Sequence, residues 1–330
     1  MADKEQKTLF SGIQPTGNIH IGNYLGALKN WVDLQEQYRC IYSIVDLHAI
    51  TIDQDPKKYQ EQIMETAIDI LAIGVDPKKA TLFVQSKVTQ HTELAWMFNT
   101  LTPMSELERM TQYKDKSQDH KENINVGLFD YPVLQAADVL LYHAEVVPVG
   151  EDQLQHLELS NMIGRKFNNK YGNFFKQIKP VITAGARIMS LTEPDKKMSK
   201  SKGEKNYIAI RDSAENIRKK VAHAVTDTGP AVEGKKSLGV NNLFELLSLF
   251  SDEKTVAKFE TQYNQKTIKY SELKKALAEA IIMTLTPIQK RIKEIETNPK
   301  KVKAILDKGA KQAQVIAEKN MADIKKKMGL

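Results

Sequence analysis

Two short segments hold side chains that could bind phosphate groups. The first is "HIGN", residues 20–23, which lies in a glycine-rich turn between a short apolar run and a helical pattern. Glycine lets the backbone come close to a ligand, and the N-terminus of a helix presents unpaired N–H groups to anions. His20 and Asn23 add side-chain donors. Taken alone, the turn is equally well explained by backbone geometry with a His that bonds within the fold.

The second segment is "KKMSKS", residues 196–201, which places three lysines within five residues. A loop of this composition can bring ammonium groups onto the phosphates of a nucleotide. A basic linker between two domains would have the same composition. The two segments together favour a triphosphate site more strongly than either does alone.

Alternating strands and helices in the first part of the chain must position these segments. Short apolar, β-branched runs predict strands at residues 8–10, 40–46, 80–86 and 144–150. Between them, Asp55-Pro56 begins an amphipathic helix that Gly74 ends. This alternation predicts an α/β fold, with a doubly wound parallel sheet covered by helices on both faces. In such a sheet, ligands bind outside the carboxyl ends of the strands.

After about residue 205 the pattern becomes helical. Segments such as "SELKKALAEAIIMTL" and "PKKVKAILDKGAKQAQVIAEKN" have the helical period, and no convincing strand pattern interrupts them. We therefore expect two domains, a catalytic α/β domain over residues 1–205 that ends in the "KMSKS" loop and a helical domain over residues 206–330. The last helix is a candidate to pack back on the first domain.

Composition limits the class of protein. The chain of 330 residues is 41% hydrophobic and 27% charged, which is typical of a globular protein that stays in water. Its one cysteine, Cys40, excludes an internal disulfide and any zinc or iron–sulfur site built from several cysteines. No run approaches the roughly 20 apolar residues that span a bilayer, and "MADKEQK" does not begin a signal peptide. We expect a cytoplasmic protein with no membrane partner.

The charge is divided unevenly along the chain. Residues 1–196 carry 20 Lys/Arg and 25 Asp/Glu, a net charge of −5, whereas residues 197–330 carry 28 and 16, a net charge of +12. A basic second part suggests contact with a polyanion such as a nucleic acid, although a solvated lysine-rich surface has the same composition.

The order of the motifs carries a specific resemblance. "HIGN", an α/β domain and then "KMSKS" resemble the class I aminoacyl-tRNA synthetases, which have a Rossmann-like catalytic domain and whose first motif reads HIGH. Further segments are similar, in order over residues 8–201, to the tryptophanyl branch of the bacterial enzymes: "FSGIQPTG", "GNYLGAL", "RMTQYKDKS", "FDYPVLQAADVLLY", "VPVGEDQ", "GARIMSL" and "KKMSKS". Asn23 departs from the last His of HIGH.

The resemblance implies an activity and an ATP site. The carboxylate of L-tryptophan would attack the α-phosphate of ATP, and the tryptophanyl group would pass from the adenylate to the 3′-terminal adenosine of tRNA(Trp). Lys116, Lys197, Lys200 and Gln14 would take part in catalysis. Mg²⁺ would accompany the phosphates, since no dedicated carboxylate cage is evident. The ATP-binding residues implied are Gln14, Pro15, Thr16, His20, Gly22, Asn23, Gly150, Glu151, Asp152, Ile188, Lys197, Met198, Ser199, Lys200 and Ser201.

The resemblance also implies a tryptophan site around "YPVLQAAD". Tyr131, Gln135 and Asp138 stand at i, i+4 and i+7, so they share one helix face. A carboxylate at Asp138 could accept the indole N–H, because indole is only a donor. We expect Gln135 either to orient Asp138 or to line the indole site, and Tyr131 either to line the site or to link to Asp138. The remaining residues implied are Phe10, His48, Val139, Val147, Val149 and Gln153.

Two other functions compete with this interpretation. Tyrosyl-tRNA synthetases resemble the same spacing and have Gln at the place of Gln135, where the tryptophan enzymes often have Met. Phe10 and Gln14 disfavour them, because they stand where the tyrosine enzymes have a Tyr and an Asp. A non-catalytic RNA-binding paralog would be expected to lose the "KMSKS" lysines or Asp138, and this chain keeps them.

The resemblance implies two partners besides tryptophan. The helical domain would read the anticodon of the tRNA, and its positive charge suits contact with phosphates. Residues 218–220 and 325–327 are basic clusters there. The family works as a homodimer, so the first domain would need an apolar patch that a second copy covers.

Overall fold

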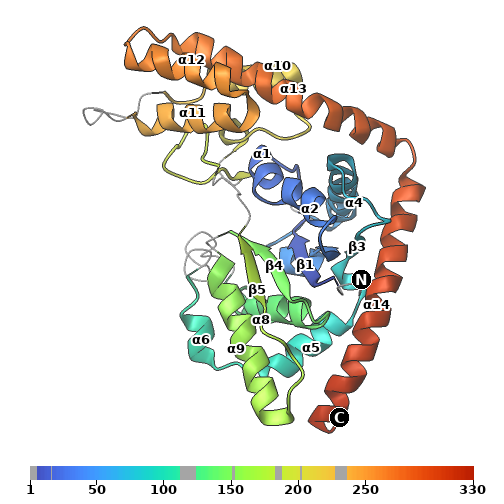
Figure 1. The fold of residues 1–330 in the computed structure, drawn as a ribbon. Helices are drawn as coiled ribbons and strands as arrows, with labels where there is room; N and C mark the ends of the chain where they lie inside the picture. The colour runs from blue at the N-terminus through green and yellow to red at the C-terminus, as the bar shows by residue number, and fades with distance from the viewer. Residues whose placement is uncertain are drawn as a thin grey trace, which may run out of the picture. The chain divides into compact units, whose positions relative to one another are not determined.

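The computed structural model describes residues 6–15, 17–111, 124–150, 153–182, 188–200, 203–226 and 236–330. One parallel sheet of five strands lies in the first part of the chain (Figure 1). Its strands are β1 (Thr8–Ile13), β2 (Arg39–Ile44), β3 (Thr81–Val84), β4 (Val146–Val149) and β5 (Lys179–Ile182). The strand order β3-β2-β1-β4-β5 is that of a doubly wound sheet, which confirms the predicted fold class.

The four strands expected from the sequence are present, and β5 was not expected. β5 pairs only with β4 and contains Pro180. Proline is tolerated on an edge strand because one side of that strand has no ladder partner. The strand order reverses direction between β1 and β4, so their carboxyl ends form the switch point at which such sheets bind ligands.

The helix α4 (Pro56–Ile73) follows from local sequence signals. The Asp55 side chain accepts a hydrogen bond from the Lys57 backbone N–H at 3.0 Å, and proline occupies the first helical position. The helix ends at Gly74, whose φ of 130° is open to glycine at no steric cost. The prediction of this helix from its cap, proline and glycine is confirmed.

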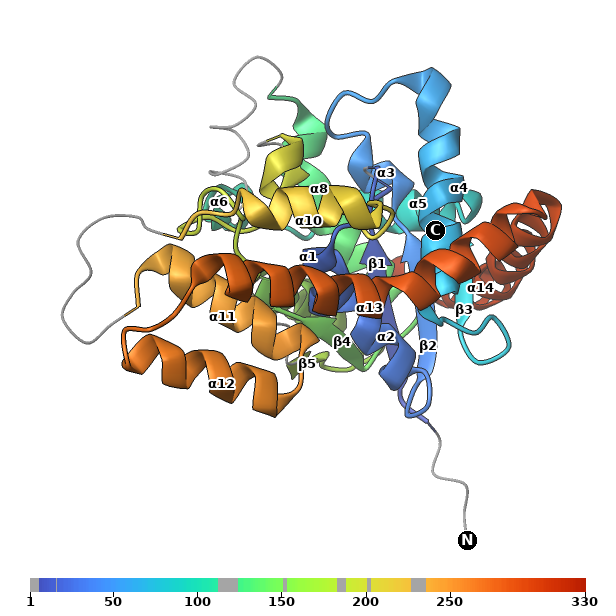
Figure 2. The same cartoon turned by 90° about the horizontal axis from the view of Figure 1, so that it is seen from above.

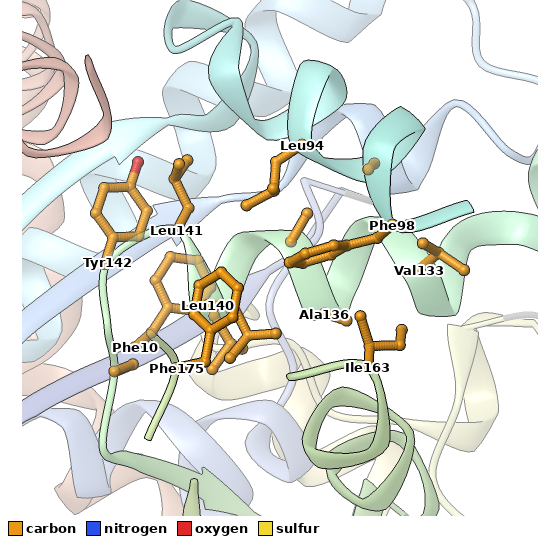
Figure 3. Close-up of a cluster of buried hydrophobic side chains, with 14 of the residues drawn as sticks. Phe10, Leu94, Phe98, Val133, Ala136, Leu140, Leu141, Tyr142, Ile163 and Phe175 are labelled. Carbon is orange, nitrogen blue, oxygen red and sulfur yellow. The ribbon is translucent and has the colours of Figure 1, made fainter. Parts of the chain in front are cut away.

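Helices cover both faces of the sheet. On one face, Phe10, Ile41 and Phe83 from three neighbouring strands pack into a buried cluster, which Figure 3 shows in part. On the other face, Trp31 stacks on Tyr42 with ring centroids 4.2 Å apart. The helices that contribute side chains to the first cluster are α5 (Gln90–Asn99), α6 (Met104–Glu108), α8 (Val126–Leu140), α9 (Leu154–Tyr171) and α14 (Pro299–Met328).

The last helix, α14, lies along the edge strand β3 (Figure 1). A Cβ on Gly309 would lie 1.9 Å from the carbonyl oxygen of Leu82, so only glycine permits this approach of helix to strand. Farther along, the Asn320 side chain donates to the carbonyl of Leu141 at 2.7 Å. α14 thus covers an edge that would otherwise expose unpaired backbone groups.

The described residues after 206 hold helices and no strand of the sheet, as the periodicity predicts. Figure 2 shows α11 lying alongside α12 and α13. The long α13 contains Pro287. These helices are α10 (Ala214–Ala222), α11 (Leu238–Phe250), α12 (Glu253–Asn264) and α13 (Tyr270–Glu296).

The chain forms two compact units. Unit 1 comprises residues 1–17, 30–184 and 297–330, and therefore holds the sheet and α14; unit 2 comprises residues 18–29 and 185–296. The "HIGN" turn and the "KMSKS" segment thus belong to the same unit. The division at residue 205 was drawn from the change to helical periodicity and stays a prediction. None of the helices in the described ranges is long and apolar enough to cross a membrane.

Candidate active site

A buried carboxylate in unit 1 is held by three side chains. Asp138, on α8, is 1% exposed. Its Oδ1 accepts from Gln85 Nε2 at 2.7 Å and lies 2.6 Å from His91 Nδ1, and its Oδ2 lies 2.8 Å from His48 Nε2. A carboxylate only accepts hydrogen bonds, so both histidines donate to it.

The carboxyl ends of the strands position two of these donors. His48 lies in α3 (Asp46–Ala49), directly after β2, and Gln85 directly follows β3. The Gln85 Oε1 accepts from the backbone N–H of Leu47 at 3.2 Å, so this amide links the ends of two neighbouring strands. His91 comes from the first turn of α5.

The network continues from His91 to Tyr142. His91 Nε2 lies 2.8 Å from the Tyr142 hydroxyl, and both residues are almost fully buried. The Tyr142 ring stacks on Phe10, with centroids 5.7 Å apart and an interplanar angle of 9°. A series of contacts therefore runs from Asp138 through His91 and Tyr142 to Phe10 of β1.

The environment keeps Asp138 ionised. Burial alone would raise its pKa, but the charges and hydrogen bonds of His91 and His48 outweigh burial and lower the pKa to about 2. Asp138 is therefore a carboxylate at neutral pH. Burial and the Asp138 charge both raise the pKa of Tyr142, so its hydroxyl stays protonated.

The "HIGN" turn of unit 2 closes on itself through two hydrogen bonds. His20 Nδ1 accepts from the backbone N–H of Asn23 at 3.2 Å, and the Asn23 Oδ1 accepts from the backbone N–H of His20 at 3.2 Å. This reciprocal cap begins the short helix α1 (Ile21–Asn23), which continues as a π-helical turn over Tyr24–Leu28. A Cβ on Gly22 would lie 2.8 Å from His20 Nδ1, so glycine leaves room for the imidazole.

The cap determines what His20 can offer a ligand. Because Nδ1 accepts, the neutral ring carries its proton on Nε2, which can donate. Burial, and then the charges of Lys200 and Lys197, lower the pKa of His20 to about 4. The ring is therefore neutral at physiological pH, in a positive environment that favours an anion.

Backbone contacts join the "HIGN" turn to the segment that follows "KMSKS". Ile21 N donates to Ile208 O at 2.9 Å, and Ile210 N donates to Ile19 O at 2.8 Å. Within "KMSKS" itself, Met198 N donates to Ile188 O at 2.9 Å. Unit 2 thus holds Ile188 beside Met198 and brings the charges of Lys197 and Lys200 near His20. Their assignment to an ATP site stays a prediction.

Comparison with known proteins decides the family. A family model described as tRNA synthetases class I (W and Y) matches residues 2–286. The chain belongs to the class I tRNA synthetases. A protein from Clostridium tetani named tryptophan–tRNA ligase is 48% identical, covering 99% of this chain and 97% of the relative, and one of the same name from Wolinella succinogenes is 46% identical over 98% and 99%.

Solved structures agree with the family. A tryptophanyl-tRNA synthetase from Campylobacter jejuni, crystallised with ADP and tryptophan, has a TM-score of 0.84 and 35% identity. The similarity covers 98% of this chain and 100% of that chain. The Rossmann-like fold of this synthetase is therefore shown by both its own sheet and its neighbours.

The other residues predicted for the amino acid site take varied places in this synthetase. The Tyr131 hydroxyl lies 3.0 Å from His156 Nε2, and its ring meets His48 edge-on. No hydrogen bond joins Gln135 to Asp138 among the described residues, so the amide that orients Asp138 is Gln85. Gln153 stands at the N-cap position of α9, and its backbone N–H donates to Gly150 O. Three predicted wall residues lie in the buried cluster: Val139, Val147 and Val149.

The residues predicted for ATP divide between the two units. Gln14, Pro15 and Gly150 belong to unit 1, where they follow β1 and β4. His20, Gly22, Asn23 and the predicted residues of 188–200, Ser199 included, belong to unit 2. Five predicted residues lie outside the described ranges: Thr16, Lys116, Glu151, Asp152 and Ser201.

Sequence reasoning missed Gln85, His91 and Tyr142. Gln85 carried a usable signal, because it stands at the carboxyl end of the predicted strand 80–86, and His48 follows the predicted strand 40–46. His91 and Tyr142 carried none, since nothing local marks a residue that bonds 47 positions along the chain. Within the described ranges, no group of three or more His, Cys, Asp or Glu side chains is arranged to hold a metal ion.

Proposed function

We propose that this chain is a tryptophan–tRNA ligase that converts L-tryptophan and ATP to tryptophanyl-adenylate and pyrophosphate and then charges tRNA(Trp). The observation that carries the proposal is the Asp138 carboxylate, buried and ionised among His48, Gln85 and His91. The names of the C. tetani and W. succinogenes relatives support it.

The Asp138 carboxylate favours the indole ring of tryptophan over the rings of phenylalanine and tyrosine. A carboxylate has about four acceptor positions, and three are occupied by the donors above. The position that remains accepts one more N–H, and indole offers one. Phenylalanine would leave that position unpaired on a buried charge, which costs roughly 1–3 kcal/mol or more. This is how a site rejects a near-isostere without an editing step.

Tyrosine must be excluded by shape as well, because its hydroxyl can also donate to Asp138. Phe10 supports the choice of tryptophan, since it has no hydroxyl to meet a phenol and is held in a stack with Tyr142. We propose that Phe10, Val139, Val147 and Val149 form the apolar surroundings of the ring. All four are also core residues, so part of their burial serves the sheet alone.

The first chemical step depends on position and charge rather than on a base. The tryptophan carboxylate is already ionised at neutral pH, so nothing need remove a proton from it. We propose that His20 donates from Nε2 to the triphosphate and that Lys197 and Lys200 stabilise charge on the leaving pyrophosphate. The lowered pKa of His20 supports this, because a neutral ring of fixed tautomer is a dependable donor.

ATP is the substrate, and we propose that Mg²⁺ enters with it. The absence of an acidic cluster among the described side chains fits a cation held chiefly by phosphate oxygens and water. The ion would neutralise phosphate charge when bound. Lys116, Gln14 and the remaining residues predicted for ATP stay assigned to this site as part of the proposal.

We propose that the protein acts in the cytoplasm as a homodimer that binds tRNA(Trp). Exposed apolar side chains in unit 1 support a dimer: Trp96 is 74% exposed on α5, Met104 63% on α6 and Val126 79% on α8. A second copy would cover them. Sedimentation should show a dimer for the wild type and a monomer for Trp96→Glu; a wild-type monomer would refute this part.

The test of function is amino-acid-dependent exchange of pyrophosphate into ATP. Tryptophan should support exchange far better than tyrosine or phenylalanine, and charging of tRNA(Trp) should follow. Faster exchange with tyrosine would overturn the proposal. Gln135→Met then tests the remaining role of that residue: unchanged affinity and selectivity for tryptophan would remove Gln135 from the ring site.

A further inference from the structure

His91 is a fully buried histidine whose one part so far is to help keep Asp138 ionised. It is 0% exposed and lies between two polar groups, the Asp138 carboxylate and the Tyr142 hydroxyl. Its ring also lies against Phe83 and Tyr142. A histidine so placed costs free energy unless both ring nitrogens are paired, and here both are.

The proton positions in this network follow from its ends. Asp138 can only accept, so Nδ1 of His91 carries a proton. In the neutral ring, Nε2 then has no proton and accepts from the Tyr142 hydroxyl. In the charged ring, Nε2 donates to the same hydroxyl. Both forms of His91 therefore donate from Nδ1 to Asp138, and Tyr142 pairs with Nε2 in both.

This arrangement distinguishes the two oxygens of Asp138. Oδ1 receives two donors, Gln85 Nε2 at 2.7 Å and His91 Nδ1 at 2.6 Å. Oδ2 receives one, His48 Nε2 at 2.8 Å. A carboxylate oxygen has two acceptor positions, so Oδ1 is filled and Oδ2 retains one.

We propose that His91 is a positioning residue for recognition of the substrate ring: together with Gln85 it fills Oδ1 of Asp138, so that Oδ2 faces the ring N–H as the one remaining acceptor. Tyr142 holds His91 in the orientation that this requires. The inference rests on the proposed function, because it assumes that Asp138 accepts the indole N–H.

The surroundings explain why His91 can fix an orientation. Tyr142 is anchored on its other side by the stack with Phe10. The neighbouring carbonyl of Leu141 accepts from Asn320 of α14 at 2.7 Å, which fixes the backbone beside Tyr142. His91 thus links the position of Asp138 to the core of unit 1.

Three substitutions separate the contacts of His91. His91→Asn retains a donor, because Asn Nδ2 lies as far along the side chain as Nδ1 of His. His91→Gln moves the donor to the distance of Nε2 and so removes the bond to Asp138. Tyr142→Phe keeps the ring and removes only the hydroxyl. Asn is smaller than Gln and leaves the larger hole, so recognition that survives in His91→Asn and not in His91→Gln would not be due to better packing.

A comparison of two substrates separates recognition of the ring N–H from effects on folding and on the reaction itself. Pyrophosphate exchange is measured for tryptophan and for β-(3-benzothienyl)alanine, in which sulfur replaces the ring N–H. Both are assayed with the same preparation of full-length protein, so any misfolded fraction cancels in the ratio of kcat/KM values. Because the ring is remote from the reacting carboxylate, the loss should fall on KM rather than on kcat.

We expect His91→Gln to raise KM for tryptophan about tenfold to hundredfold, the range for loss of a hydrogen bond to a charged group, and to change KM for the sulfur analogue less than about threefold. His91→Asn should keep most of the preference for tryptophan, and Tyr142→Phe should be intermediate. Equal losses for both substrates in His91→Gln, or equal behaviour of the Asn and Gln variants, would show a purely structural role and overturn the inference.

Exchange assays on the wild-type protein distinguish failure of this inference from failure of the proposed function. No exchange with tryptophan would refute the proposed function itself. Exchange with tryptophan and with the sulfur analogue at equal kcat/KM would leave the activity standing but refute recognition of the N–H, and with it the role of His91.

Discussion

Gly22→Ala tests whether the geometry of the "HIGN" turn matters to catalysis through His20. The added Cβ would lie 2.8 Å from Nδ1 and 2.9 Å from Cε1 of His20, where ordinary contacts begin at 3.4 Å. The imidazole must therefore move by roughly half an ångström or rotate away. Since a side chain can yield, the stability cost is small, about 1 kcal/mol for the weakened cap.

The cost to the reaction should be larger. A displaced ring no longer aims its Nε2–H at the triphosphate, and a hydrogen bond to a charged group contributes about 1.5–3 kcal/mol, which corresponds to about 10- to 150-fold in rate. Adenylate formation is measured in single turnovers with saturating ATP and tryptophan. Gly26→Ala is the matched control, because no atom beyond its neighbours and its own helix backbone lies within 4 Å of its added Cβ, and it should react normally.

A double-mutant cycle identifies the route of the effect. If Gly22→Ala acts by displacing the imidazole, it should have little effect in a His20→Ala background. An equal loss of rate in both backgrounds would refute the reasoning, because Gly22 would then serve the approach of ATP to the backbone and not the orientation of His20.

Three further predictions concern single features. Lys200→Ala should lower the rate of adenylate formation with little change in tryptophan binding; a large loss of affinity with normal single-turnover chemistry would contradict its role at the phosphates. Gly309→Ala should destabilise the fold by about 1–3 kcal/mol in denaturant unfolding, because its Cβ would lie 1.9 Å from Leu82 O, and an unchanged midpoint would contradict the packing of α14. The pKa of His20 is about 4 in the folded chain and about 6.5 when unfolded. Because the folded chain favours the neutral ring, the contribution of His20 to the free energy of unfolding is complete above pH 6.5 and is lost as the pH falls to 4, by up to about 3 kcal/mol. His20→Gln should make the free energy of unfolding less sensitive to acid, and a pH profile identical to the wild type would refute this.

The strands and helices that the sequence predicts are those with strong local signals. The apolar run at 40–46 and the cap and proline at Asp55-Pro56 need no knowledge of the rest of the chain. β5 has a weaker signal: both β4 and β5 have four residues and one proline, but β4 is otherwise all valine, whereas β5 begins with the charged Lys179. The π-helical turn at Tyr24–Leu28 was not foreseen either, since nothing in its composition distinguishes it from α-helix.

The amino acid site was predictable only where a recognisable motif marks the residue. Asp138 and His48 come from recognisable motifs, and the structure joins them by a hydrogen bond. The sequence left two roles open for Gln135, to orient Asp138 or to line the indole site, because it shares the helix face of Asp138. The structure instead uses Gln85, whose place at the end of β3 brings it to the carboxylate from a distant part of the chain. Long-range pairing of this kind follows from the order of the strands, which periodicity does not determine.

The Asn that ends "HIGN" gains a physical explanation from the reciprocal cap. A side chain at position 23 must accept a hydrogen bond from the backbone N–H of His20, and Asn23 does so at 3.2 Å. A histidine there, as in HIGH, can accept through a ring nitrogen, so the departure retains the same capping chemistry. In return, the backbone N–H of Asn23 holds Nδ1 of His20 as an acceptor. The proton of the neutral ring is thereby placed on Nε2, so a substitution that looks like the loss of a catalytic histidine preserves the donor that His20 presents.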